Sequence, residues 1–156
     1  MSGMGRIPKD ERISHEFSER IMLAVTAVNQ CAYCSFLHTR TALEKGIQLE
    51  QIHQILEGEI GSFSDEEMPA VLYGQHFAET MGEVSPAARD KFFSAYGPSR
   101  AGHIEGYIMS VCFGNLCSNT VYARENGLMG VEQKSKGLLV YLLSKPIAAG
   151  IKMGGK

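Results

Sequence analysis

The fold of the first third of the chain follows from residues 19–46, which read ERIMLAVTAVNQCAYCSFLHTRTALEKG. Apolar residues cover all sides of its early part, Ile21–Val25, which predicts a buried helix. With the apolar residues that precede it at spacings of three and four, this helix is expected over about residues 12–28. Asn29-Gln30 is a polar break. A second helix is predicted from Ala32 to Lys45, stopping at a glycine.

Two cysteines and a histidine fall at the start of that second helix, in the order Cys31, Cys34, His38. A helix turns about 100° per residue, so Cys34 lies ~60° and His38 ~20° from Cys31, all on one face. Cys34 and His38 are one turn apart, so thiol and imidazole can meet directly or through a water. The CxxC spacing also allows the two sulfurs to close a disulfide.

This spacing provides the parts of a thiol redox site. The start of a helix favours a thiolate, and a nearby imidazole can take the proton. The thiolate is the form that attacks peroxide or a disulfide. Peroxide converts it to a sulfenic acid, which a neighbouring thiol turns into a disulfide. The helix dipole alone favours Cys31 as the more acidic thiol, whereas proximity to His38 favours Cys34.

Glu19 joins this group only if the chain turns sharply at Asn29-Gln30. In one straight helix Glu19 would lie about 18 Å from Cys31, out of reach. In an antiparallel helical hairpin, Glu19 and His38 come level. A carboxylate beside an imidazole orients it and raises its basicity, as in catalytic triads. A sharp turn therefore predicts a site with two thiols, an imidazole and a carboxylate.

The segment Glu19 … Cys31-Ala-Tyr-Cys34-Ser-Phe-Leu-His38, continuing to Gly46, resembles the active-site segment of the alkylhydroperoxidase-D-like proteins of the carboxymuconolactone decarboxylase superfamily. Their pattern is Glu, eleven residues, Cys, two residues, Cys, three residues, His, and every element is present. The close match covers roughly residues 15–60. Beyond it, only the helical character is shared.

The resemblance implies roles for the four residues. Cys34 would be the cysteine oxidised to sulfenic acid, Cys31 the proton donor and resolving thiol, and His38 with Glu19 the proton relay. It implies a thiol peroxidase or protein disulfide reductase, a hydroperoxide or disulfide as substrate, and an external dithiol as electron donor. It also implies an all-α fold and a homo-oligomer, a trimer or a hexamer. True carboxymuconolactone decarboxylases of the superfamily lack the CxxC pair, so its presence favours the redox branch.

Two alternatives to a redox enzyme remain open. A decarboxylase-type enzyme of the same fold would leave the thiols without a role in the reaction. A non-catalytic helical oligomer would use Cys31, Cys34, His38 and a fourth ligand to bind zinc. Structural zinc sites usually draw their ligands from two separated pairs, and the chain has no second CxxC or HxxxH. No haem, flavin or nucleotide motif occurs, so no bound cofactor is expected.

The rest of the chain predicts further helices separated by short loops. A helix is expected over residues 48–57, with Leu49 on its apolar side. The capping box Ser64–Glu67 opens another helix that runs to about Met81, with Leu72 facing inward. Ser85-Pro86 begins a helix that ends near Gly97-Pro98. Two more are expected over residues 101–126 and 131–144. The sequence predicts a single all-α domain, a bundle of six to seven helices over residues 1–156, with 1–11 and 147–156 as flexible tails.

Composition excludes several classes of protein. The chain has 156 residues, 44% hydrophobic and 21% charged, with a formal net charge of -2. These values are typical of a globular domain and give no basic patch for nucleic acid or a membrane surface. The longest near-continuous apolar run, Ile21–Val28, is broken by Thr26 and is far short of a membrane span. Residues 1–12 lack the apolar region of a secretory signal, so we expect a cytoplasmic protein.

The other pair of cysteines has no such pattern. Cys112 and Cys117 would point about 140° apart on a helix and are expected to be buried small apolar residues. One spacing occurs twice in the chain: Glu105 precedes Cys117 by twelve positions, as Glu19 precedes Cys31. The sequence alone does not decide whether this is a degenerate repeat or coincidence.

Overall fold

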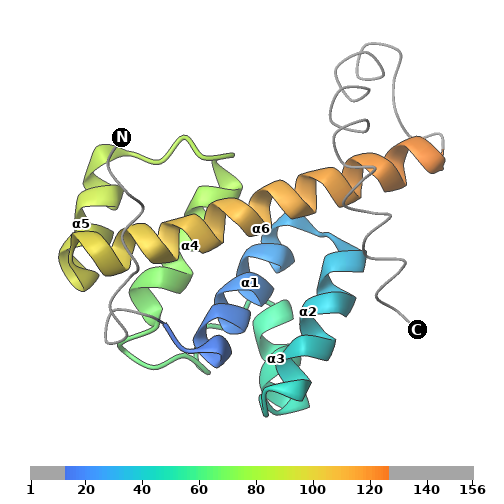
Figure 1. Ribbon diagram of the computed structural model, residues 1–156, viewed down its shortest axis with the longest axis horizontal. Coiled ribbons are helices and arrows are strands. Elements are labelled where there is room, and N and C mark those ends of the chain that lie inside the picture. Colours follow the sequence, from blue (N-terminus) through green and yellow to red (C-terminus); the bar gives the residue numbers. More distant parts are fainter. Residues whose placement is uncertain (1–12, 127–156) are drawn as a thin grey trace, which may run out of the picture. The chain divides into compact units, whose positions relative to one another are not determined.

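The computed structural model describes residues 13–126, and these residues form helices without a strand (Figure 1). The described helices are α1 (His15–Asn29), α2 (Ala32–Glu44), α3 (Leu49–Leu56), α4 (Met68–Glu79), α5 (Pro86–Tyr96) and α6 (Pro98–Glu125). The all-α prediction is confirmed. The helix expected over residues 131–144 and the two expected tails lie outside the described residues.

The helix starts follow from caps and prolines. Ser85 caps α5 as expected, its side chain accepting a hydrogen bond from the Ala88 N–H at 3.3 Å. The Ser64–Glu67 capping box also forms, but the prediction that α4 begins there is wrong. The structure starts α4 at Met68. Pro69 has no N–H to donate to the preceding turn, so residues 64–67 close as a turn instead.

The long sixth helix also begins earlier than expected. It starts at Pro98 rather than Ala101, directly after α5. Proline is well tolerated at a first helical position, where its missing N–H has no partner to lose. Gly97, with φ 75°, makes the corner between the two helices. The Gly97-Pro98 pair therefore both ends one helix and starts the next.

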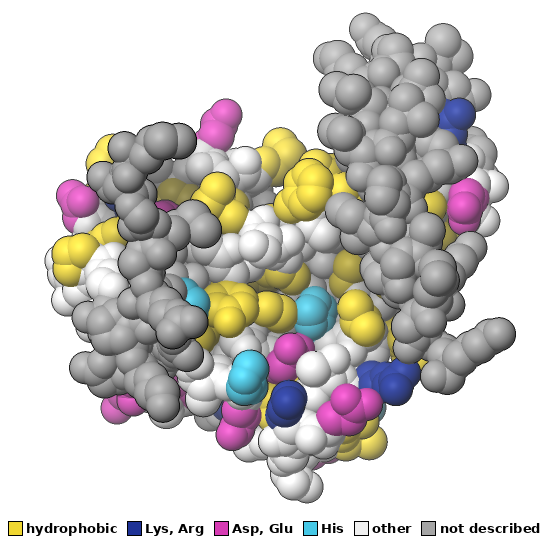
Figure 2. All heavy atoms as spheres, viewed as in Figure 1, with side chains coloured by type: hydrophobic (Ala, Val, Ile, Leu, Met, Phe, Trp, Pro, Cys, Tyr) yellow, Lys and Arg dark blue, Asp and Glu magenta, His cyan; other side chains and the backbone are white. Residues whose placement is uncertain are grey.

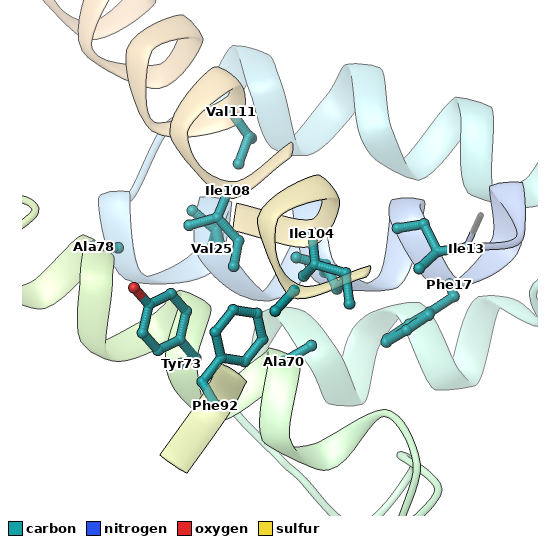
Figure 3. Close-up of a cluster of buried hydrophobic side chains, with 12 residues drawn as sticks. Ile13, Phe17, Val25, Ala70, Tyr73, Ala78, Phe92, Ile104, Ile108 and Val111 are labelled. Carbon is teal, nitrogen blue, oxygen red and sulfur yellow. The ribbon is translucent and has the colours of Figure 1, made fainter. Parts of the chain in front are cut away.

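Helix α1 lies between two apolar clusters. One cluster joins it to α4, α5 and the first part of α6, and the side chains of Val25, Tyr73 and Ile108 lie in it (Figure 3). The other joins α1 to α2, α3 and α4 through Leu23 and Ala24. A helical segment that is apolar on all sides needs such a position, and the expectation that the Ile21–Val25 part is buried is confirmed.

Close approach of helices in the first cluster depends on Gly74 of α4. A Cβ added there would lie 3.0 Å from Cγ2 of Val25, closer than most Cβ contacts, so the Val25 side chain would have to shift. Burial on the outer helices was predicted less well. Leu49 and Leu72, expected to face the core, are 52% and 48% exposed, while Ile55 and Tyr73 are buried in their place. Short helices with apolar residues on two sides leave the inward face to tertiary packing.

The chain comprises two compact units, residues 1–112 and 113–156. All four residues of the predicted redox site lie in the first. That the whole chain is one domain stays a prediction. None of the helices within the described residues has the length and apolar character that crossing a membrane requires.

Candidate active site

The turn between α1 and α2 takes one residue in the left-handed conformation. Gln30 has φ 51° and ψ 39°, and its N–H bonds back to the carbonyl of Ala27 at 3.3 Å. Cys31 follows in extended conformation as the N-cap of α2. The helix thus ends and the chain turns within two residues, at the position that the sequence predicted. Helix α2 then packs beside α1 as an antiparallel hairpin.

Cys31 and Cys34 are paired as a disulfide at the start of α2, with their Cα atoms 5.2 Å apart. The Cys34 N–H also donates a hydrogen bond to Sγ of Cys31 at 3.3 Å. Both residues are buried, Cys31 at 1% exposure and Cys34 at 6%. Of the two, Cys34 therefore presents the larger surface to a reactant.

The imidazole of His38 meets the carboxylate of Glu19 across the hairpin. Nδ1 of His38 lies 2.9 Å from Oε2 of Glu19, and the two side chains are 17% and 13% exposed. With Nδ1 protonated toward Glu19, the second ring nitrogen is left as a base. The geometric expectation that these residues come level is met, although their separation in sequence is nineteen residues.

Cys34 and His38 lie one turn apart on the same helix, α2. Residues with this spacing have Cβ atoms about 5–6 Å apart, close enough for a thiol and an imidazole to share a proton directly or through a water. The hairpin therefore gathers the four residues predicted from sequence. Figure 2 shows histidine side chains lying among acidic and apolar ones on one face of the molecule.

The remaining cysteines are free. Cys117 is buried as expected, and burial raises the pKa of its thiol. Cys112 is only partly buried, and the Asn29 amide approaches its sulfur at 3.8 Å. Burial raises the pKa of Cys112 as well, with the Asn29 contact opposing it. Raised pKa values keep both thiols in the unreactive protonated form.

Sequence reasoning missed Arg20, which follows Glu19 in α1. The sequence analysis assigned it no role, but the residue is only 5% exposed. Its guanidinium donates to the carbonyl of Ser62, and Nε lies 3.2 Å from Oε1 of Glu67. The signal was available: Arg20 falls three positions after Phe17, on the apolar side of the helix.

No group of three or more His, Cys, Asp or Glu side chains within residues 13–126 is arranged to hold a metal ion. The two candidate zinc-binding sulfurs are bonded to each other, and the candidate imidazole is bonded to Glu19.

Comparison with known families supports the identification made from the sequence. The model of the carboxymuconolactone decarboxylase family matches residues 3–72, a segment that contains Glu19, Cys31, Cys34 and His38. No curated protein and no solved structure matches the chain. Over this segment, the match confirms the superfamily that was recognised in the sequence.

Proposed function

We propose that this chain, which carries a carboxymuconolactone decarboxylase family segment, is a CxxC thiol-dependent peroxidase or protein disulfide reductase. The observation that carries the proposal is the Glu19–His38 pair at 2.9 Å, held one turn from a cysteine that can form a disulfide with its neighbour. A buried structural disulfide has no need of an oriented base, whereas thiol redox chemistry does.

The proposed reaction begins with the reduced pair. His38 takes the proton of Cys34, and the thiolate attacks the terminal oxygen of a hydroperoxide. A sulfur–oxygen bond forms as the oxygen–oxygen bond breaks, and the leaving alkoxide takes the proton back to become an alcohol. The products are the alcohol and a Cys34 sulfenic acid. Glu19 holds the imidazole in place and stabilises it while it carries the extra proton.

Resolution uses the second thiol. Cys31 attacks the sulfenic sulfur, the disulfide forms, and the hydroxyl group leaves with the Cys31 proton as water. An external dithiol then reduces the disulfide and is itself oxidised. With a disulfide substrate, Cys34 attacks sulfur instead of oxygen, and Cys31 resolves the mixed disulfide in the same way.

The test measures free thiols in reduced protein during addition of a hydroperoxide. We expect the loss of two thiols per chain, one equivalent of alcohol, and a Cys31–Cys34 disulfide in peptide mapping. The Cys31→Ser variant is expected to accumulate a sulfenic acid at Cys34 that a dimedone-type reagent traps. Trapping at Cys31 in the Cys34→Ser variant instead would reverse the two roles. Unchanged thiols with both hydroperoxides and disulfides would reject the proposal.

A decarboxylase-type lactone enzyme is the second candidate, and the matched family supports it by name. In that case the thiols would be dispensable. Alkylation of reduced Cys31 and Cys34 separates the two candidates: it abolishes thiol redox turnover, but leaves a decarboxylase active on a lactone substrate.

The proposal also covers the cellular location and the oligomeric state of the protein. Redox cycling of the pair requires a reducing compartment, which supports a cytoplasmic location. The superfamily supports a homo-oligomer, as do large apolar side chains left exposed on α2, Tyr33 at 44% and Phe36 at 69%. Sedimentation of the purified chain tests this, with a trimer or hexamer expected and a monomer contradicting it.

A further inference from the structure

We propose that Arg20 is a positioning residue for the redox site: its ion pair with Glu67 fixes the rotation of α1 and thereby keeps Glu19 in hydrogen-bond contact with His38. The inference rests on the proposed function for its meaning in catalysis. Its geometric part stands on contacts within the first compact unit.

Arg20 is anchored on three sides. A guanidinium N–H donates to the Ser62 carbonyl, and the guanidinium carbon lies 5.1 Å from the centre of the Phe63 ring. Nε lies 3.2 Å from Oε1 of Glu67, the two side chains being 6% and 18% exposed. This last contact is an ion pair without hydrogen-bond geometry, because the buried Nε–H has no acceptor among the described residues.

Glu67 is itself held by its other oxygen. Oε2 accepts hydrogen bonds from the N–H of Ser64 at 3.0 Å and from its hydroxyl at 3.1 Å. The capping box therefore fixes the carboxylate that receives Arg20. A continuous series of contacts leads from the turn before α4, through Arg20, to the side of α1.

Arg20 and Glu19 are consecutive residues, so about 100° of helix rotation separates their directions. Arg20 points toward the segment before α4, while Glu19 points toward α2. A side-chain tip roughly 6 Å from the axis moves about 1 Å when the helix rotates by 10°. A hydrogen bond of 2.9 Å is largely lost by such a displacement. Anchoring Arg20 thus fixes the position of the neighbouring Glu19 carboxylate.

Burying a cation on an otherwise apolar helix side is unfavourable unless it is paired, so Arg20 is a poor choice for packing alone. An apolar residue of similar length would fill the same space, and such replacements of whole buried ion pairs are often neutral or stabilising. A directional anchor is what the pair supplies that an apolar residue cannot.

The experiment uses the full chain and the Arg20→Met, Arg20→Lys and Glu67→Gln variants. The first readout is the ring ¹⁵N chemical shifts of His38 in the reduced protein, which report whether Nδ1 carries the proton that faces Glu19. We expect Arg20→Met to move these shifts toward the Nε2-protonated form. Arg20→Lys restores part of the charge contact and should recover part of the change. Wild-type shifts in Arg20→Met would overturn the inference.

The second readout is turnover in a double-mutant cycle with His38→Ala. We expect Arg20→Met to lower kcat/KM about tenfold, and to cost little more once His38 is absent. Arg89→Met is the matched control, because it breaks another ion pair of the same unit, that of Arg89 with Glu105. It should leave both the ¹⁵N shifts and the turnover near wild type. Full additivity of Arg20→Met with His38→Ala would also overturn the inference.

If Arg20→Met does not fold, Glu67→Gln decides the question. Glutamine retains the size of Glu67 and can still accept the Ser64 hydrogen bonds, but removes the ion pair. A smaller shift of the His38 resonances in the same direction is expected, and no shift overturns the inference. Because ¹⁵N shifts need no substrate, a wild-type chain without peroxide or disulfide turnover would reject the proposed function and leave this test intact.

Discussion

Two carboxylates of the first unit, Glu19 and Glu105, each contact a side chain on another helix, but the partners differ in their chemistry. Each is mostly covered, at 13% and 16% side-chain exposure, and each reaches across to another helix. Glu19 contacts the imidazole of His38. Glu105 accepts a hydrogen bond from the Tyr73 hydroxyl at 2.6 Å and a bidentate contact from Arg89 at 3.0 and 3.2 Å.

The partners decide what each carboxylate can do. Arg89 keeps its charge at every accessible pH. Burial, followed by the hydrogen bond to Glu105, raises the pKa of Tyr73 well above its usual range. Burial also raises the pKa of Glu105, but bonds from Arg89 and Tyr73 outweigh it and hold the net pKa below its ordinary value. This group therefore binds α4, α5 and α6 together without moving a proton.

The chain after each carboxylate differs as well. A cysteine stands twelve positions after each carboxylate, which is the equal spacing noted in the sequence. After Glu19 the helix breaks at Gln30, and α2 returns beside α1. After Glu105 the helix α6 continues without a break past Cys117. The same spacing in sequence therefore belongs to a helical hairpin in one case and to a continuous helix in the other.

The largest expected effect separates the cysteines of the two regions. Cys34→Ser should lower peroxide or disulfide turnover by about 10³-fold or more, because it removes the attacking atom. Cys117→Ser should leave turnover near wild type, since this thiol is buried and protonated. The measurement is steady-state turnover with excess dithiol. Equal losses in the two variants would remove the distinction between the regions.

Next in size is the loss of each carboxylate. Glu19→Gln should lower kcat/KM by about 10²-fold, within the range expected for a disabled proton relay. Glu105→Gln should change kcat/KM little, because its partners do not titrate near neutral pH. Kinetics at pH 7 with both variants checks this. A large kinetic defect in Glu105→Gln, with folding intact, would show that its group also serves the reaction.

For the free energy of unfolding, we expect the larger effect from the Glu105 variant and the smaller one from the Glu19 variant. Glu105→Gln is expected to lower the free energy of unfolding by about 1 kcal/mol, a figure reduced because Arg89 is half exposed and screened by solvent. The folded-state pKa of Glu105 lies below its ordinary value of 4.5. Its contribution is therefore complete above that value and is lost as pH falls through the lowered pKa. Urea unfolding at pH 7 and at pH 3.5 should show the variant to be less sensitive to acid than wild type.

The smallest effect concerns the break that makes the hairpin. Gln30→Gly should stabilise the chain by about 0.5 kcal/mol, because glycine adopts the left-handed conformation without strain. The gain is small because glycine also loses more conformational entropy on folding. Met81 has the same conformation, with φ 52°, beyond α4, so Met81→Gly is the matched control. Thermal unfolding of both variants checks the estimate. Destabilisation in Gln30→Gly alone would indicate that the Gln30 side chain has a role at the turn.

Sequence reasoning located the candidate-site segment and most helices, but not the inward faces or the ion pairs. Helical periodicity and caps depend on neighbours three and four residues away, so α1, α2 and α5 were anticipated within a few residues. The burial of Leu49 and Leu72 was predicted wrongly, because their helices carry apolar residues on more than one side. The position of Arg20 on the apolar side of α1 is a local signal, but its ion-pair partner Glu67 lies forty-seven positions away and no local pattern identifies it.

What the sequence determined by itself is local: a CxxC pair and a histidine on one face of a helix, and a break before them. These follow from bond geometry and helical spacing within a few residues. Tertiary structure decided which carboxylate faces an imidazole and which faces an arginine. Such pairs depend on how separate helices pack, and packing is a property of many distant residues acting together.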